Sequence, residues 1–259
     1  MPEFGAGNTG IANLFQGFAQ QDVHWAIANG STTTFDFYGF GAALSTLGGG
    51  LTTNARVGNG TYYASLGSII ETSVSNINQQ YGFGMASAGY SVFQSSVGNS
   101  RVGNYFVSFT FRIESLNADG RFFCGTCTFN TPPTSAALVP SAQPDLVGFA
   151  KDSGDTTLQV LSAAAAGSGI KTDTKIPTAS LVGIGLTVTV QSFVSAVTLT
   201  MTNIDTGIQL YKQTVQSPNS PLPRANTQLS PFVSASTGPT VAAARAMSLR
   251  KLIVAVPTL

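Results

Sequence analysis

Charged side chains are scarce in this sequence: Asp, Glu, Lys and Arg make up 9% of its 259 residues, against about a quarter in a typical soluble domain. The 12 basic and 11 acidic residues leave a net charge of +1. The chain therefore lacks the clustered basic charge with which proteins bind nucleic acid. Because few charges protect such a surface against association, we expect part of it to be covered by other subunits.

Groups that could carry catalysis or hold a metal ion are just as scarce. The sequence contains one histidine, His24, and two cysteines. A single imidazole beside scattered acids, with no paired motif, offers little material for hydrolytic or metal-dependent chemistry. We therefore expect no enzymatic activity, no metal ion and no cofactor. Apolar runs of 18 or more residues are also missing, so the sequence predicts no membrane-spanning helix.

The two cysteines form a C-x-x-C pattern, Cys124-Gly125-Thr126-Cys127. A redox motif of this kind lies where a strand gives way to a helix, but here strand-like residues flank the pattern on both sides. A zinc site would need two further ligands. The pattern therefore favours two small, half-buried residues of a strand, and a structural disulfide is left open.

Two carboxylates lie close together in Asp152-Ser153-Gly154-Asp155. Their oxygens could suggest calcium, but the bidentate Glu of a calcium loop does not follow at the required offset. The same residues are typical of turns in which Asp side chains accept hydrogen bonds from nearby backbone amides. We interpret the segment as the turn of a hairpin.

Apolar and polar residues alternate along several stretches. Between Tyr105 and Ile113 the alternation has the period of two that marks a half-buried strand. Further strands are expected at residues 121–129, 146–150, 157–161, 181–190, 197–202, 208–212 and 249–256, with proline loops at 131–144 and 217–223. Ten or more strands and no convincing long helix predict an all-β, antiparallel β-sandwich of jelly-roll-like type over residues 51–259.

Residues 1–50 differ from the rest of the chain. They carry several large apolar side chains, end in Gly48-Gly49-Gly50, and are too few to form a core of their own. We interpret them as an extended N-terminal arm that docks on a neighbouring protein, and the alternative is an N-terminal strand pair of the main domain. The candidate docking residues are Leu14, Phe15, Phe18, Trp25, Phe35, Phe37 and Phe40.

One stretch is more specific than the composition. The segment Gly120-Arg121-Phe122-Phe123-Cys124-Gly125 precedes a proline-rich loop and then the run from Leu146 to Val160. This arrangement resembles a β-sandwich of structural proteins of tailed bacteriophages, in which an R-F/M-F-x-G strand precedes a G-F/V-x-x-D-S-G-D-T-x-L-Q hairpin. The resemblance implies a protein of the virion surface, without catalytic residues. Since trimers are common in that family, a homotrimer is the expected assembly.

Within this resemblance the sequence favours a structural protein that decorates or cements the capsid as a trimeric knob. Its arm would bind the major capsid protein or another virion protein. The alternative is the receptor-binding tip of a tail fibre or baseplate, which would bind a host surface glycan. Exposed aromatic side chains could serve such binding, although a tyrosine in a strand more often packs in the core. The candidates are Tyr62, Tyr63, Tyr81, Tyr90 and Tyr211.

Overall fold

The computed structural model describes residues 21–27, 34–38, 43–47, 51–52, 70–74, 80–84, 93–94, 105–128, 139–193, 195–224, 227–238 and 245–257. Strands dominate these residues, which also form two short 3-10 helices, η2 (Pro140–Ala142) and η3 (Thr178–Leu181). This described part contains no helix that is long and apolar enough to cross a membrane. The predicted all-β class is confirmed.

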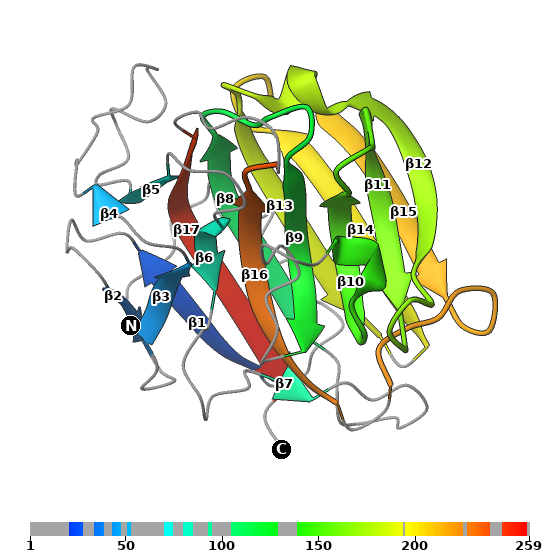
Figure 1. Cartoon of the computed structure of the whole chain (residues 1–259). Helices are drawn as coiled ribbons and strands as arrows, with labels where there is room; N and C mark the ends of the chain where they lie inside the picture. Colours follow the sequence, from blue (N-terminus) through cyan, green and yellow to red (C-terminus); the bar gives the residue numbers. More distant parts are fainter. Residues whose placement is uncertain are drawn as a thin grey trace.

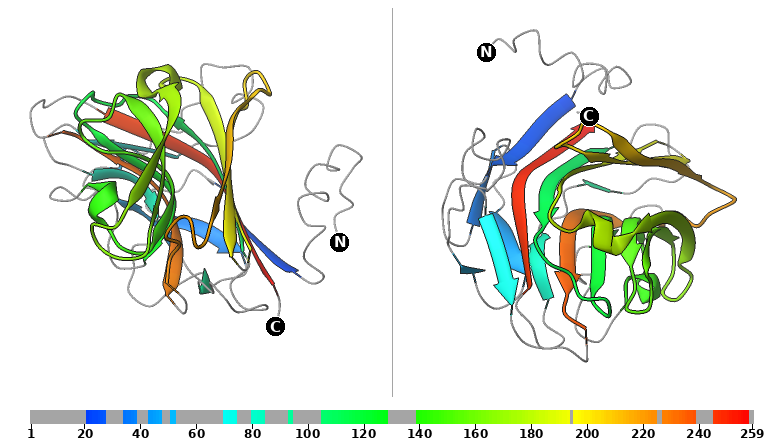
Figure 2. Two further views of the ribbon diagram at one scale, coloured as in Figure 1. Left: turned by 90° about the vertical axis from the view of Figure 1, so that its right-hand side faces the viewer. Right: turned by 90° about the horizontal axis from the view of Figure 1, so that it is seen from above.

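Two antiparallel sheets face each other (Figures 1 and 2). Sheet A runs in the order β2–β1–β17–β8–β13–β14–β15, and β5, which carries β4, also pairs with β17. Its strands are β1 (Gln21–Ile27), β2 (Thr34–Tyr38), β4 (Leu51–Thr52), β5 (Ile70–Val74), β8 (Phe106–Ile113), β13 (Gly185–Ser192), β14 (Ala196–Asn203), β15 (Gln209–Gln216) and β17 (Arg245–Pro257).

Sheet B shares β2 and runs in the order β2–β3–β6–β16–β9–β10–β11–β12, with β7 also paired to β16. Its other strands are β3 (Ala43–Leu47), β6 (Gln80–Gly84), β7 (Phe93–Gln94), β9 (Arg121–Thr128), β10 (Leu146–Lys151), β11 (Thr157–Ala163), β12 (Ile170–Pro177) and β16 (Gln228–Ser236). The predicted antiparallel β-sandwich is thereby confirmed, including the hairpin of β10 and β11.

The main core lies between the two sheets. Strand β8 crosses the middle of sheet A, between β17 and β13. Its Phe109, Phe111 and Ile113 are buried in this core. Phe111 stacks on Phe122 of the opposite sheet, with ring centroids 6.1 Å apart. The alternation read from the sequence therefore points every second side chain of β8 into the core.

A second apolar cluster lies away from this core, and η2 packs against three strands that contribute to it, β9, β10 and β11. Figure 1 shows η2 in front of β10. Because consecutive side chains of a strand point to opposite faces, residues of β9 divide between the two clusters. The second cluster contains Phe123, Cys127, Leu146, Ala150, Leu161, Ala163 and Phe232.

The two cysteines show this division directly. Cys124 belongs to the main core and Cys127 to the second cluster, so the two thiols, three residues apart on β9, point to opposite faces. Both are free and buried, and burial raises the pKa of each thiol. The disulfide that the sequence left open is therefore absent from this pair.

The expectation of a separate arm at residues 1–50 is corrected for its described strands. Strand β1 pairs with β17 along seven residues, with Trp25 opposite Ile253. Strand β2 pairs with β1 and β3, and β3 pairs with β6. These segments satisfy their backbone hydrogen bonds inside the two sheets, so the alternative interpretation, N-terminal strands of the main domain, describes them.

The predicted docking residues divide accordingly. Trp25 lies on β1, and Phe35 and Phe37 lie on β2. The remaining four, Leu14, Phe15, Phe18 and Phe40, lie outside the described residues. The three described docking residues therefore lie on strands that pair within the two sheets.

Candidate functional site

A pocket of about 320 Å³ opens at the end of the sandwich that is uppermost in Figure 1. Three segments meet there: the β8–β9 turn, the β10–β11 turn, and η3 with the residues that follow it. The lining combines apolar with polar side chains. It consists of Leu116, Asn117, Ala118, Asp155, Thr156, Thr178, Ala179 and Val182.

A buried lysine ties two of these segments together. Lys151 ends β10 and is 1% exposed. It follows Val147 and Phe149 on the face of β10 that packs in the core. Its Nζ donates hydrogen bonds to the carbonyls of Ala118 and Gly120, both at 2.7 Å, and to the carbonyl of Asp152 at 3.2 Å. One ammonium thus holds the β8–β9 turn against the β10–β11 turn.

Burial of this ammonium lowers its pKa. The carboxylates of Asp155, Asp119 and Asp152 act in the opposite direction, because nearby negative charge favours the protonated form. All three donor hydrogens of Lys151 have a backbone acceptor. The charge is therefore compensated by hydrogen bonds and by three neighbouring acids, which is the condition for keeping an ammonium inside a protein.

Threonines attach the third segment of the pocket. The backbone N–H of Thr178 donates to the carbonyl of Thr156 at 3.1 Å. The hydroxyl of Thr178 donates to the same carbonyl at 3.2 Å. These two bonds hold η3 beside the β10–β11 turn, so all three segments that line the pocket are cross-linked.

The β10–β11 turn has the internal bonding that its sequence predicts. The N–H of Asp155 donates to the carbonyl of Asp152 at 3.1 Å, and the N–H of Asp152 donates to Oδ2 of Asp155 at 2.9 Å. The carboxylate of Asp152 has another role. It accepts hydrogen bonds from the N–H and the hydroxyl of Ser141 in η2. The Asp turn is confirmed, and it also anchors η2.

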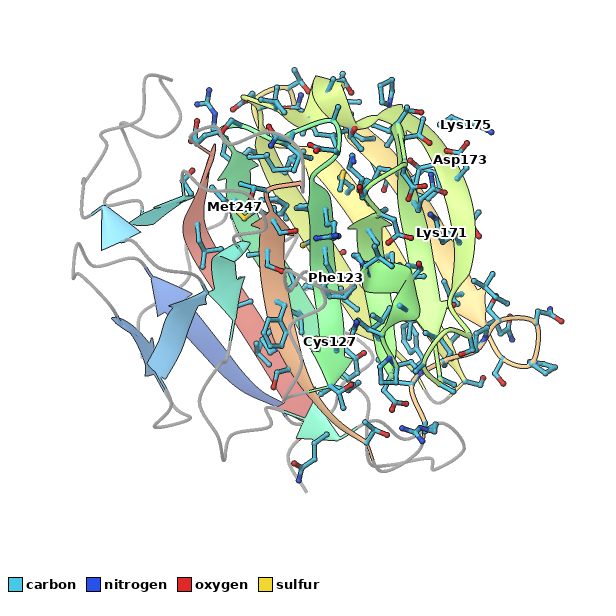
Figure 3. All side chains as sticks on the ribbon, viewed as in Figure 1. Phe123, Cys127, Lys171, Asp173, Lys175 and Met247 are labelled. Carbon is cyan, nitrogen blue, oxygen red and sulfur yellow. The ribbon has the colours of Figure 1, made fainter. Side chains whose placement is uncertain are left out.

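A second lysine reaches the same turn from the edge strand of sheet B. Figure 3 shows Lys171, Asp173 and Lys175 along β12. The Nζ of Lys171 lies 2.7 and 2.6 Å from the two oxygens of Asp155, and 3.1 Å from Oδ2 of Asp152. Burial alone would lower the pKa of Lys171, but the hydrogen bonds that its ammonium donates to the carboxylates of Asp155 and Asp152 outweigh this effect, and the pKa is raised.

The turn that suggested calcium thus holds a lysine ammonium between its two carboxylates. Within the described ranges, no group of three or more His, Cys, Asp and Glu side chains is placed to hold a metal ion. Of the residues named from the sequence, Asp152 and Asp155 belong to this site. Lys151 and Lys171 were not predicted as site residues, although the period of two along a strand places Lys151 on the same face as Phe149.

The two described tyrosines proposed for glycan contact, Tyr81 and Tyr211, are not among the residues that line this pocket. Tyr211 is partly buried against the main core, and its ring meets that of Phe149 edge-on at 6.1 Å. Tyr81 lies on β6, and Tyr62, Tyr63 and Tyr90 lie outside the described residues. For Tyr211 the packing interpretation is therefore correct.

Solved structures share this fold over nearly the whole chain. A protein of unknown function from Shewanella oneidensis MR-1 matches with a TM-score of 0.57 at 12% identity, covering 99% of this chain and 96% of its own. Peanut lectin in complex with a nine-residue peptide matches with a TM-score of 0.55 at 14% identity, covering 92% and 97%. Winged bean acidic lectin, in complex with methyl-α-D-galactose, matches with a TM-score of 0.50 at 9% identity, covering 92% and 99%.

These similarities establish the lectin-like β-sandwich fold of the chain and nothing finer, because the identities are so low. No protein-family model matches the sequence, and no curated protein matches it. Any assignment of function must therefore be argued from the pocket.

Proposed function

We propose that this protein is a non-enzymatic carbohydrate-binding module whose ligand is a sugar unit held in the pocket between the β8–β9 turn, the β10–β11 turn and η3. One observation carries the proposal: an apolar surface and several hydrogen-bonding groups meet in one pocket that the fold holds rigidly. Sugars present the same combination, with C–H groups on the faces of the ring and hydroxyl groups around its edge.

The size and lining of the pocket suit one ring of a glycan. Its volume of about 320 Å³ lies at the lower end of the range of small-molecule sites. Leu116 and Val182 supply the apolar surface, and Asp155 and Thr156 bring oxygen atoms to it. A carboxylate already fixed by Lys171 can still accept hydrogen bonds from sugar hydroxyls, since each of its oxygens has more than one acceptor site.

The charge of the site favours an uncharged ligand. Asp155 is the charged side chain among the lining residues, and Asp119 and Asp152 lie close enough to act on Lys151. The carboxylate of an acidic sugar would therefore meet the carboxylate of Asp155 in the pocket, and like charges repel. Neutral hexoses are therefore the ligand class that we propose.

The fold adds support of a weaker kind. Two of the similar solved structures are lectins, and one of them is in complex with a galactose derivative. The phage resemblance of the hairpin adds the virion context, in which a glycan-binding module would sit at the tip of a tail fibre or baseplate and recognise the host. The hypothesis of capsid decoration depended on an arm that is free of the sandwich. Strands β1 to β3 pair within the sheets, so this hypothesis loses its main support.

The test is a glycan-binding measurement with a pocket-filling variant. Wild-type protein is screened on an array of neutral, amino and acidic glycans, and a hit is titrated by isothermal calorimetry. Ala179 is exposed at the pocket, so Ala179→Trp should fill it and abolish binding. Ala166→Trp, in the exposed β11–β12 turn, is the matched control and should bind as wild type does. Unchanged affinity of Ala179→Trp, or a wild type that binds no neutral glycan, would refute the proposal.

A further inference from the structure

The ammonium of Lys171 occupies the point on which two carboxylates of the β10–β11 turn converge. Three carboxylate oxygens, two from Asp155 and one from Asp152, lie within 3.1 Å of its Nζ. The side chains are partly shielded from water: Lys171 is 30% exposed, Asp152 15% and Asp155 19%. Shielding of this degree weakens the screening that makes exposed ion pairs nearly neutral in energy.

Two carboxylates that approach each other this closely repel, and proteins commonly place a cation between them. In a calcium site that cation is a metal ion surrounded by oxygens at 2.3–2.6 Å. Here the N···O distances are 2.6–3.1 Å, which are those of an ammonium that donates charge-assisted hydrogen bonds. The cation is part of the chain, attached to β12.

We propose that Lys171 is a positioning residue that supplies the sugar pocket with a built-in cation, so that glycan binding requires no divalent metal ion. The inference rests on the proposed function, because it concerns the same pocket. It adds that an ion pair within the chain orients the carboxylate of Asp155, and it predicts that a chelator does not lower the affinity for the glycan.

A continuous set of contacts connects Lys171 with the ligand site. Its ammonium fixes both oxygens of Asp155, which lines the pocket. Oδ2 of Asp155 also accepts the N–H of Asp152, so the carboxylate is held from two directions. If the ammonium is removed, repulsion between Asp152 and Asp155 favours rotation of the Asp155 carboxylate away from this position, and the pocket loses an oriented acceptor.

The neighbouring lysine cannot replace this function. Lys151 donates its three hydrogen bonds to backbone carbonyls of the two turns, so its donors are already used. Lys175, on the same strand as Lys171, pairs with Asp173 at 2.7 Å and its side chain is 83% exposed. Lys175 is therefore a suitable control: a lysine of β12 in an ion pair that does not involve the pocket.

The experiment measures affinity for the best neutral glycan by calorimetry, with and without EDTA. Wild type should bind equally well in both conditions. Lys171→Met should lose affinity by roughly two- to fivefold, the range that corresponds to removing an ion pair near the surface, whereas Lys175→Met should bind as wild type does. Melting curves of both variants show whether the fold is retained.

A rescue measurement separates positioning from general structural damage. Lys171→Ala should recover affinity when propylammonium is added at millimolar concentration, because the small cation can enter the space left by the side chain. Calcium ion is tested in parallel, and recovery by either cation supports the inference, since a merely structural lesion would respond to neither.

The possible failures are distinguishable. Loss of wild-type binding in EDTA would overturn the inference and leave glycan binding intact. Wild-type affinity in Lys171→Met, or the absence of any cation rescue in a folded Lys171→Ala, would also overturn the inference alone. A wild type that binds no glycan would overturn the proposed function, and the inference with it.

Discussion

Replacement of Lys151 by methionine is the sharpest test of how the pocket is held together. Methionine matches the length of the lysine stem without the ammonium, so Lys151→Met removes three hydrogen bonds to backbone carbonyls. A hydrogen bond from a charged donor contributes about 1.5–3 kcal/mol. The loss of three such bonds would destabilise the fold by more than most single substitutions do, if no other effect opposed it.

The opposing effect is the cost of burying the ammonium of a side chain that is 1% exposed. Methionine does not carry that cost, and apolar replacement of a buried charge can be neutral or stabilising. Here, however, the carbonyls of Ala118, Gly120 and Asp152 remain in place without their donor, and an unsatisfied buried acceptor costs about 1–3 kcal/mol. We therefore expect the cost of the three unsatisfied carbonyls to exceed the gain from removing the buried charge, with a net destabilisation of about 2–4 kcal/mol.

Urea unfolding followed by circular dichroism measures this difference. Lys212→Met, on the exposed side of β15, is the control and should change the free energy of unfolding by less than about 0.5 kcal/mol. Amide exchange should rise in the β8–β9 turn of Lys151→Met, because that turn loses its tie. Stability of Lys151→Met equal to or above that of wild type would show that the three carbonyls do not depend on the ammonium, and the reasoning would fail.

Three further predictions follow from the described contacts, and a fourth from the phage resemblance. Gly148→Ala should destabilise by roughly 1–3 kcal/mol in thermal melts, since a Cβ there would meet a backbone oxygen at 2.5 Å, whereas Gly154→Ala, with no atom within 4 Å, should not. The buried thiols of Cys124 and Cys127 should react with a thiol reagent only after unfolding, because burial raises their pKa and blocks access. The folded pKa of Lys171 is raised above 10.5, so its stabilisation relative to Lys171→Met should be complete below pH 10.5 and disappear as pH rises through the folded pKa. The homotrimer that we expect from the phage resemblance should give the mass of three chains in light scattering, and a monodisperse monomer would contradict it.

The strands that were predicted well are those in which the alternation of apolar and polar residues determines which side chains face the core. Strand β8 begins and ends within one residue of the predicted stretch, because Phe109 and Phe111 fill the core while Thr110 between them faces the other side of the sheet. Strand β16 was missed for a physical reason. It has Pro231 in its middle and serines around it, a composition that argues against a central strand, yet it pairs with β9 on one side and with β6 and β7 on the other.

The pairing of the described N-terminal strands was not predicted, because pairing partners far apart in sequence leave no local signal. Trp25 lies opposite Ile253, so the segment that buries the backbone of β1 comes more than two hundred residues later. Apolar residues in a short N-terminal segment predict that something must cover them, but they do not say whether the cover is a neighbouring protein or the end of the same chain. Long-range sheet pairing places the backbone of β1 beside β17, and only the three-dimensional structure contains this pairing.

Only part of the candidate site could be predicted from the sequence, for a related reason. Asp152-Ser153-Gly154-Asp155 is a turn signal that any reading of the sequence finds, and the turn forms as expected. The two lysines that contact the turn come from β10 and β12. The side chain of Lys171 reaches the turn from β12, which lies two strands away from β10 in the sheet. Local sequence can identify a turn of this kind, but it cannot identify which cation the turn receives.

The corrected arm also changes the weight of the two virion functions. A knob that clamps a capsid lattice needs an extension that can leave the knob, since the extension must reach its neighbour. Strands β1 and β3 hydrogen-bond to β17 and β6, and pulling them out would expose two sheet edges and break the pairing of seven residues of β1. A receptor-binding tip needs no such release, because its ligand comes to a site that is already formed. The pocket between the three cross-linked segments could be such a site, and this is why we propose glycan recognition in preference to capsid decoration.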